Sequence, residues 1–313
     1  MSWLHIPHNA QYALGGILGI LVAASLIVLV LRWLRPAKDY AELVARVQSW
    51  WVMFFIFTLA MVVSPTVSIV FFAIVSFLAL KEYLSLIPTR RADRRVLFWA
   101  YLAIPFQYYW VADAWYGMFI IFVPVYAFLF LPMRMVLTGQ TQNFLRSAGT
   151  IHWGLMLMVF SLSHLAYLLA LPPEGNPAAG AAGLVLYLVF LTQFNDVAQY
   201  TWGKLLGRHK VVPSVSPKKT VEGLAGGVMT TTALGWLLAP WLTPLSGVEG
   251  LLAGLIIGLA GFIGDVNISA LKRDLGVKDS GQLIPGHGGI LDRVDSLTYA
   301  APLFFHFVYY LHY

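Results

Sequence analysis

The sequence contains no cysteine, and this absence excludes disulfide bonds and thiolate metal sites. It also lacks a G-x-x-x-x-G-K-[ST] motif, which argues against a P-loop ATPase. Charged residues are scarce, because Asp, Glu, Lys and Arg make up only 11% of the 313 residues while hydrophobic residues make up 59%. A soluble domain carries about 25% charged residues. The chain therefore has too few charges to cover a surface that faces water, and we expect a membrane protein.

Long runs of apolar residues follow one another along the chain, and about 20 such residues are needed to span a bilayer. We predict an all-α, polytopic integral membrane protein with about ten transmembrane helices. Their expected ranges are 11–31, 50–64, 66–86, 97–113, 115–132, 151–171, 182–203, 222–242, 250–270 and 294–311. The first range has no Lys or Arg before it and no small-residue cleavage site after it, which favours a retained helix over a signal peptide.

All twenty Lys and Arg residues fall in every second loop of this arrangement. The basic loops are 32–49, 81–96, 133–150, 204–221 and 271–293. Because Lys and Arg accumulate on the cytoplasmic side of membranes, we predict a multi-pass protein of the cell (inner) membrane with both termini outside. The net charge of +6 then describes a cytoplasmic face suited to membrane lipids and phosphates. No compact basic domain is present, so nucleic acid is not an expected partner.

The two parts of the chain, 1–180 and 181–313, differ in the polar residues of their spans. In the first part, large apolar helices are joined by arginine-rich loops, and we interpret it as a membrane scaffold. In the second part, Asp, Lys, Arg, His, Ser and Gly enter the helix ends and two inner loops, as expected of a catalytic domain. Within the scaffold, residues 38–50 have the apolar spacing of an amphipathic helix on the membrane surface, although an ordinary connector fits equally well.

Asp196 lies inside the predicted span 182–203. A carboxylate at that depth costs about 2.5–3.5 kcal/mol on insertion scales and is by default a functional candidate. Tyr200, Gly203 and Gly207 follow on the same helical face, so the carboxylate is flanked by little bulk. The alternative is a structural carboxylate that a neighbouring helix neutralises.

Asp265 lies near the inner end of the span 250–270, and Ser269 and Lys272 follow at i+4 and i+7 on one helical face. This face presents a hard oxygen ligand, a hydroxyl and a cation in order as the helix leaves the membrane. Mg²⁺ prefers a few carboxylates together with substrate phosphates. Snorkelling at a helix end would explain Lys272 and Arg273 but not Asp265.

Asp292 begins the last helix, and Asp295 and Ser296 follow it at i+3 and i+4. An Asp at a helix start is often a cap, and this structural role fits Asp295 as well as a functional one does. It fits Asp292 less well, because either of the other two side chains could supply the cap.

Two inner loops carry groups that suit phosphates. In the first, Gly286, Gly288 and Gly289 flank His287, so the backbone can approach a ligand closely and offer N–H groups. Many loops turn on glycine, and His287 could be a proton carrier, a phosphate donor or a packing residue. The second loop holds Lys204, Arg208, Lys210, Lys218 and Lys219. It would grip anionic lipid or, given its proximity to Asp196 in the chain, a triphosphate.

These parts indicate one reaction class. Carboxylates at the inner membrane boundary would hold a divalent metal, cations would hold a phosphate chain, and a lipid phosphate would arrive sideways from the bilayer. We therefore predict metal-assisted phosphoryl or nucleotidyl transfer. These residues by themselves identify neither the nucleobase nor the lipid.

The segment SALKRDLGVKDSGQLIPGHGGILDRVD, residues 269–295, resembles the signature of the phosphatidate cytidylyltransferase (CDP-diacylglycerol synthase) family. NDVAQYTWGKLLGRHK and SVSPKKTVEGLAGG resemble the family's second conserved block, so the likeness covers about residues 190–300. It implies transfer of the cytidylyl group of CTP to phosphatidate or a related lipid phosphate at the cytoplasmic membrane face, with release of pyrophosphate. The sequence does not set the number of subunits, and a homo-oligomer is compatible with it.

The resemblance also implies roles for individual residues. Mg²⁺, with a second metal ion beside it, would bind at Asp265 and Asp292, and Lys272 and Ser269 would complete the catalytic group. The substrate-binding residues that it implies are Asp196, Ser216, Lys219, Glu222, Arg273, Lys278, Asp279, His287, Arg293 and Asp295.

One departure from the family pattern is Ile268, which stands where typical members have a glutamate before the signature serine. This departure, with the long N-terminal half, predicts a divergent branch and leaves the acceptor lipid open. The alternatives are a CTP-dependent enzyme that acts on an isoprenoid lipid or lipid phosphate, and a membrane transporter whose Asp196 serves an ion path. The transporter gives no reason for the signature.

Overall fold

The computed structural model describes residues 6–36, 39–281, 283–286 and 288–313, and over these ranges the protein is built of helices without a β-strand. The elements in chain order are α1 (His8–Leu34), α2 (Ala41–Val63), α3 (Pro65–Leu86), η1 (Arg91–Asp93), α4 (Arg94–Ala112), α5 (Tyr116–Ile121), η2 (Phe122–Ala127), α6 (Phe128–Val136), α7 (Phe144–Leu155), η3 (Met156–Ser161), α8 (Leu162–Ala170), η4 (Pro173–Gly175), α9 (Gly180–Leu206), α10 (Val221–Leu242), α11 (Gly247–Asp274), α12 (Leu291–Val294) and α13 (Leu297–His312).

Helices α5 and α6 are joined through the π-helical turn η2, and α7 and α8 through η3, so each pair forms one long helical segment. Over the described residues, seven helical segments are long and apolar enough to cross a membrane: α1, α2, α3, α5–α6, α7–α8, α9 and α11. The prediction of an all-α polytopic membrane protein is confirmed.

Helix α2 differs from the expectation for residues 38–50. It runs without a break from Ala41 to Val63, so residues 41–50 are neither a separate surface helix nor a connector but extend the second span, while Lys38 lies outside the described residues. The helix is therefore 23 residues long, which is long enough to cross a bilayer. It ends at Ser64, whose side chain accepts a hydrogen bond from the Val67 N–H and so caps α3, while Pro65 occupies the first turn.

The helices pack around one apolar core that runs from Ile6 to Val308, so both predicted parts of the chain contribute to it. Helices α10 and α11 approach each other closely at Gly235 and Gly254, because neither residue has a side chain; a Cβ atom at Gly235 would lie only 2.7 Å from the Gly254 Cα atom. The proposed boundary at residue 180 coincides with the start of α9. The division into a scaffold part and a catalytic part stays a prediction.

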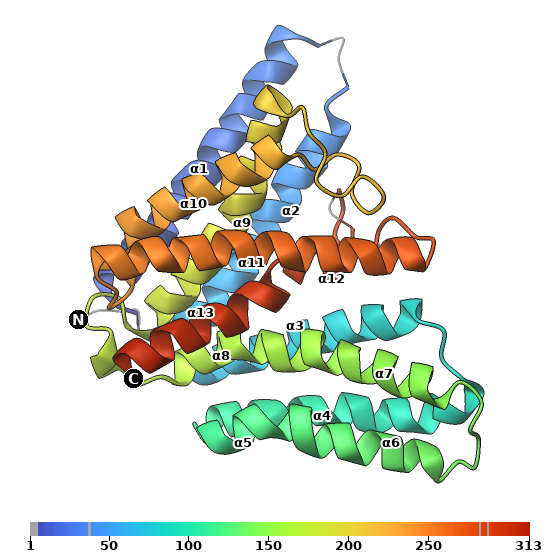
Figure 1. Ribbon diagram of the computed structural model, residues 1–313. Coiled ribbons are helices and arrows are strands. Elements are labelled where there is room, and N and C mark those ends of the chain that lie inside the picture. Colours follow the sequence, from blue (N-terminus) through green and yellow to red (C-terminus); the bar gives the residue numbers. More distant parts are fainter. Residues whose placement is uncertain (1–5, 37–38, 282, 287) are drawn as a thin grey trace.

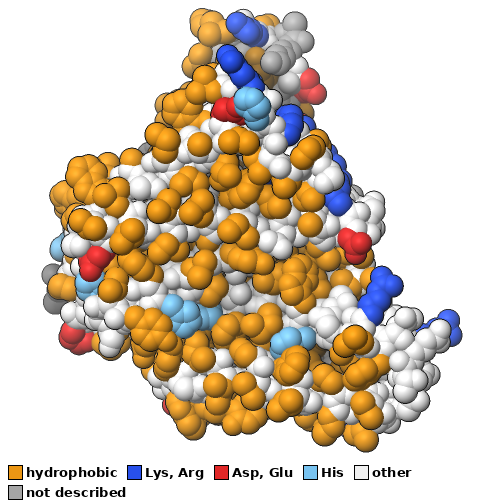
Figure 2. Space-filling view, in the orientation of Figure 1, with side chains coloured by type: hydrophobic (Ala, Val, Ile, Leu, Met, Phe, Trp, Pro, Cys, Tyr) orange, Lys and Arg blue, Asp and Glu red, His pale blue; other side chains and the backbone are white. Residues whose placement is uncertain are grey.

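Figure 1 shows both chain termini at the left of the molecule, whereas the loops that join α3 to α4, α6 to α7, α9 to α10 and α11 to α12 lie at the right. On the face drawn in Figure 2, Lys and Arg side chains gather along the upper and right edges, and hydrophobic side chains cover the middle. This separation agrees with the loop pattern of the sequence. Which of the two sides faces the cytoplasm stays a prediction.

A buried ion pair joins two of these loops. The Arg90 guanidinium donates to both carboxylate oxygens of Asp93 at 2.7 Å and to the backbone carbonyls of Gln140 and Gln142 at 3.0 and 2.7 Å. Ser147 also donates to Asp93, which is fully buried. Burial by itself raises the pKa of Asp93, but the hydrogen bonds from Arg90 and Ser147 and the charge of Arg90 together hold it below its ordinary value.

Candidate active site

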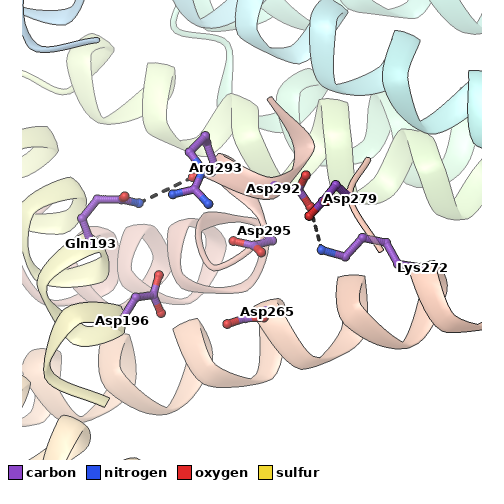
Figure 3. A pocket seen from close by; sticks show the side chains of 8 residues that line it. All are labelled: Gln193, Asp196, Asp265, Lys272, Asp279, Asp292, Arg293 and Asp295. Atoms are coloured by element: carbon purple, nitrogen blue, oxygen red, sulfur yellow. Dashed lines mark hydrogen bonds and ion pairs between the residues drawn. The ribbon is translucent and has the colours of Figure 1, made fainter. Parts of the chain in front are cut away.

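A polar cavity of about 260 Å³ lies where α9, α11 and α12 meet. Its lining residues, shown in Figure 3, are Gln193, Asp196, Asp265, Lys272, Asp279, Asp292, Arg293 and Asp295. Five of these eight side chains are carboxylates and two are cations, so the cavity is built for positive charge. The three acidic positions that stand far apart in the sequence are therefore brought together.

Asp265 points into this space from α11 and makes two contacts there. Its Oδ2 atom lies 2.5 Å from the Nζ atom of Lys219, and its Oδ1 atom accepts a hydrogen bond of 3.2 Å from Ser269. The i+4 spacing thus sets Ser269 beside the carboxylate as expected. Lys219 comes from the loop between α9 and α10, and its ammonium group also lies 4.8 Å from the centre of the Phe262 ring.

Both carboxylate oxygens of Asp292 have partners within the protein. The Lys272 ammonium lies 2.6 Å from its Oδ1 atom, and Oδ2 accepts hydrogen bonds from the Ser280 N–H, the Ser280 hydroxyl and the Gly289 N–H at 2.9 to 3.1 Å. Burial raises the pKa of Asp292, but the hydrogen bond and the charge of Lys272, with the N–H donors, bring it below its ordinary value. Asp292 is therefore ionised at neutral pH despite its burial.

The glycine-rich loop wraps around this carboxylate. Gly288 has a φ of +83°, and a Cβ atom there would lie only 2.6 Å from Oδ2 of Asp292. The Gly289 N–H donates its hydrogen bond to the same carboxylate. The glycines thus bring the backbone close to a carboxylate of the protein itself, while His287 lies outside the described residues.

Asp196 and Asp295 complete the acidic group, and Figure 3 shows their carboxylates turned toward Asp265 across the cavity. Asp196 accepts a hydrogen bond from the Ser296 hydroxyl at 3.2 Å, and Asp295 accepts one from the Ser296 N–H at 2.7 Å. In the described part of the chain, no Lys or Arg forms an ion pair with either of them. Among the described residues, Asp196 thus has a hydrogen-bond donor at the start of the neighbouring helix α13 but no cationic partner.

A second cavity of about 310 Å³ is lined by both members of the Lys219–Asp265 pair. Its lining residues are Asp196, Gln199, Tyr200, Gly203, Lys204, Ser216, Lys218, Lys219, Thr220, Gly223, Leu224 and Asp265. Three lysines and three hydroxyl side chains suit an anion here. The Nε2 atom of Gln199 is buried without a hydrogen-bond partner, and the Tyr200 side chain is 68% exposed on the outer face of α9. The two cavities share Asp196 and Asp265.

Comparison with known proteins assigns the chain that forms these cavities to a family. Residues 44–311, well over half of the chain, match the model of the cytidylyltransferase family. This chain belongs to the cytidylyltransferase family. It is therefore a nucleotidyltransferase. The match reaches back into α2, further than the likeness over residues 190–300 indicated.

Individual relatives of this cytidylyltransferase differ in how much of it they cover. It is 45% identical over 300 residues to the uncharacterized protein YnbB of Escherichia coli (strain K12), which covers 96% of this chain and 98% of that protein. It is 52% identical over 114 residues to the phosphatidate cytidylyltransferase of Synechocystis sp., and 38% identical over 170 residues to that of Mycobacterium leprae. These two alignments cover 36% and 54% of this chain, and 39% and 52% of the respective enzymes. Partial similarity to the named enzymes fits a divergent branch.

Three of the predicted substrate-binding residues of the cytidylyltransferase do not line either cavity in the described part of the chain: Glu222, Arg273 and Lys278. Glu222 holds the loop between α9 and α10, accepting hydrogen bonds from the N–H groups of Arg208 and His209 and contacting His209 Nδ1 at 2.6 Å. Arg273 donates to the carbonyls at positions 215 and 277. Both therefore shape the loops that border the site.

Sequence reasoning missed Glu82 of α3. Its carboxylate accepts hydrogen bonds from the N–H groups of Ile290 and Leu291 at 2.9 and 2.8 Å, and one of its oxygens lies 3.1 Å from the Ser280 hydroxyl oxygen. The available signal was a carboxylate near the end of an apolar span, but the adjacent Lys81 and the basic loop that follows concealed it. Ile268, the departure from the family pattern, is fully buried in the apolar core.

Proposed function

We propose that this cytidylyltransferase transfers the cytidylyl group of CTP to phosphatidate, or to a closely related lipid phosphate, and forms CDP-diacylglycerol and pyrophosphate. The observation that carries this proposal is the convergence of an acidic and a basic cavity on the Lys219–Asp265 ion pair, beside an apolar outer face of α9. The names of the relatives in Synechocystis and Mycobacterium leprae support the substrates.

The reaction needs an attacking phosphate and a leaving pyrophosphate in line. A non-bridging oxygen of the lipid phosphate attacks the α-phosphorus of CTP, and the new P–O bond forms as the bond to the β-phosphate oxygen breaks. The electron pair of the broken bond leaves with pyrophosphate, so charge increases on the leaving group. Positioning and charge neutralisation supply most of the catalysis in such transfers.

The cations of the site suit this charge. Lys204, Lys218 and Lys219 line the second cavity and would contact the phosphate oxygens of CTP. The buried Nε2 atom of Gln199 is a donor that a phosphate oxygen would satisfy. The outer face of α9 beside this cavity carries exposed apolar side chains, including Val197 at 54%, along which the acyl chains of an acceptor lipid would lie.

The donor chemistry of the first cavity fits Mg²⁺, because its anionic ligands are all carboxylate oxygens. No three Asp, Glu or His side chains of the described residues are already arranged to hold a metal ion. Lysines instead pair with Asp265 and Asp292. We propose that these two carboxylates hold Mg²⁺ and a second ion when substrate binds. A bound divalent ion would neutralise charge on the phosphate chain.

The test is product identification with the purified protein in detergent. CTP labelled at the α-phosphorus should transfer its label to phosphatidate and yield labelled CDP-diacylglycerol, while CTP labelled at the γ-phosphorus should release labelled pyrophosphate. Chelation of divalent ions should stop the reaction, and added Mg²⁺ should restore it. Label from the γ-phosphate on the lipid would overturn the proposal in favour of a kinase. A parallel series with isoprenoid phosphates determines the acceptor.

The proposed topology needs a separate test, because it bears on where CTP is supplied. We propose that the site opens to the cytoplasm, since the loops that form it are the basic ones. A membrane-impermeant reagent directed at a cysteine introduced at Lys210 should react only after inverted vesicles expose the cytoplasmic face. Reaction from the outside of intact cells would contradict this orientation.

A further inference from the structure

Glu82 is a half-buried carboxylate near the C-terminal end of α3, in the part of the chain expected to be scaffold. The residue after it, Tyr83, is fully buried, whereas Lys81 before it is exposed. A carboxylate in such surroundings is costly unless hydrogen bonds satisfy it. Its partners come from residues about 200 positions further along the chain, so its role is in the tertiary structure and not in α3 itself.

The two oxygens of this carboxylate contact different partners. Oε1 accepts the Ile290 N–H at 2.9 Å, and Oε2 accepts the Leu291 N–H at 2.8 Å. Oε2 also lies 3.1 Å from the Ser280 hydroxyl oxygen, whose single proton is shared between Glu82 and Asp292. The first N–H groups of a helix have no partner within the helix. Glu82 therefore satisfies the donors that begin α12 and sets the direction in which that helix leaves the loop.

The residues that follow these donors line the acidic cavity. Asp292 is the next residue after Leu291, and Arg293 and Asp295 follow it in the same turn. The Ser280 hydroxyl lies within hydrogen-bonding distance of both Glu82 and Asp292, so the two carboxylates are linked through one side chain. Space for this arrangement requires Gly289, where a Cβ atom would overlap Glu82 Oε2 and the Ser280 hydroxyl.

We propose that Glu82 is a positioning residue for the cytidylyl transfer: it fixes the start of α12 and, through Ser280, the orientation of Asp292, without contacting substrate. The N-terminal half of the enzyme thus sets the geometry of the catalytic carboxylates. The kinetic part of this inference rests on the proposed function, whereas the hydrogen-bonding part does not.

The test is the variant Glu82→Gln, which keeps the size of the side chain but replaces one acceptor oxygen by an NH₂ group that cannot accept an N–H bond. We expect kcat per folded molecule to fall about 10- to 100-fold, as a small misplacement of catalytic groups does. The KM for CTP should stay within about threefold, because the residue touches no substrate. The matched control is Glu174→Gln, an exposed carboxylate in η4, which should leave kcat unchanged.

Amide hydrogen exchange tests the hydrogen bonds of Glu82 by a measurement that does not depend on activity. In the wild-type protein the N–H groups of Ile290 and Leu291 should exchange slowly, and in Glu82→Gln about tenfold faster. A kcat within about twofold of wild type for a monodisperse Glu82→Gln protein would overturn the proposal. If Glu82→Gln does not fold, Glu82→Asp takes its place. Fast exchange of the Ile290 and Leu291 N–H groups in the wild-type protein would also overturn the proposal.

The two possible failures are distinguishable. If the wild-type protein forms no CDP-lipid from any phosphate acceptor, the proposed function fails, but slow exchange at Ile290 and Leu291 that Glu82→Gln abolishes still establishes the positioning contact. If the wild type is active and Glu82→Gln matches it, the positioning role fails and the proposed function stands.

Discussion

The ion pair between Lys272 and Asp292 is a buried interaction whose removal should have a large effect on stability. Its atoms are 2.6 Å apart, and the two side chains are only 12% and 7% exposed. In the variant Lys272→Met the aliphatic stem remains and the ammonium is lost. Asp292 then stays buried as a carboxylate without its cation, which is the situation in which removal of one partner is most destabilising.

The magnitude follows from what Asp292 retains. Breaking a buried pair by removing one partner costs about 3–5 kcal/mol. Asp292 keeps three hydrogen bonds, two from Ser280 and one from Gly289, so the lower end of this range applies and we expect about 3 kcal/mol. For a chain of this length, about 2 °C is lost per kcal/mol, so the midpoint of thermal unfolding should fall by about 6 °C.

The pH dependence has a definite sign. In the wild type the pKa of Asp292 is below its ordinary value, so its contribution to stability is present above about pH 4 and is lost as the pH falls below that. In Lys272→Met the burial that raises this pKa is no longer opposed by the lysine. The destabilisation should therefore be largest near pH 8 and smaller at pH 5, where the unpaired carboxyl begins to take up a proton.

The assay is thermal unfolding of the purified protein in detergent, followed by intrinsic tryptophan fluorescence. The matched control is Arg46→Met, because its partner Glu42 is 74% exposed and such a pair contributes at most about 1 kcal/mol. The double variant Lys272→Met/Asp292→Asn should be more stable than Lys272→Met alone. A midpoint for Lys272→Met at pH 8 that falls no more than that of Arg46→Met would refute the reasoning.

Four further outcomes are expected. Asp265→Asn and Asp292→Asn should each abolish turnover in a protein that still inserts and folds, and substantial Mg²⁺-dependent activity in either variant would remove that residue from the proposed metal site. Asp93→Asn should lower the unfolding midpoint at pH 7 but show a smaller further loss on acidification to about pH 3 than the wild type, because the folded-state pKa of Asp93 lies below its ordinary value; equal acid sensitivity would contradict this. Gly289→Ala should reduce kcat, since its methyl group would overlap the Glu82 carboxylate, and unchanged kcat would be the opposing result. A tag at either terminus should be reachable only from outside the membrane, and labelling from the cytoplasmic side would reverse the proposed topology.

The family resemblance could be recognised from sequence because the signature residues are local. Asp265 to Ser269 is one turn of helix, and the glycines that wrap Asp292 lie within a few residues of it, so their chemistry shows in spacing alone. Glu222 and Arg273 belong to the same conserved-looking segments, but their side chains turn to the loops that border the site. Spacing does not separate a residue that contacts substrate from one that shapes the loop beside it.

The sequence by itself determined that the chain is a helical membrane protein with its basic loops on one side, because scarcity of charge and the length of apolar runs are set by the bilayer and need no tertiary contact. It also determined the family, through a signature contained in one continuous segment. Only the tertiary structure decided which lysine pairs with which carboxylate, so that Lys219 neutralises Asp265 and Lys272 neutralises Asp292. It also joined Glu82 of α3 to the start of α12, since such contacts arise from helix packing between residues some 200 positions apart and leave no periodic trace in the chain.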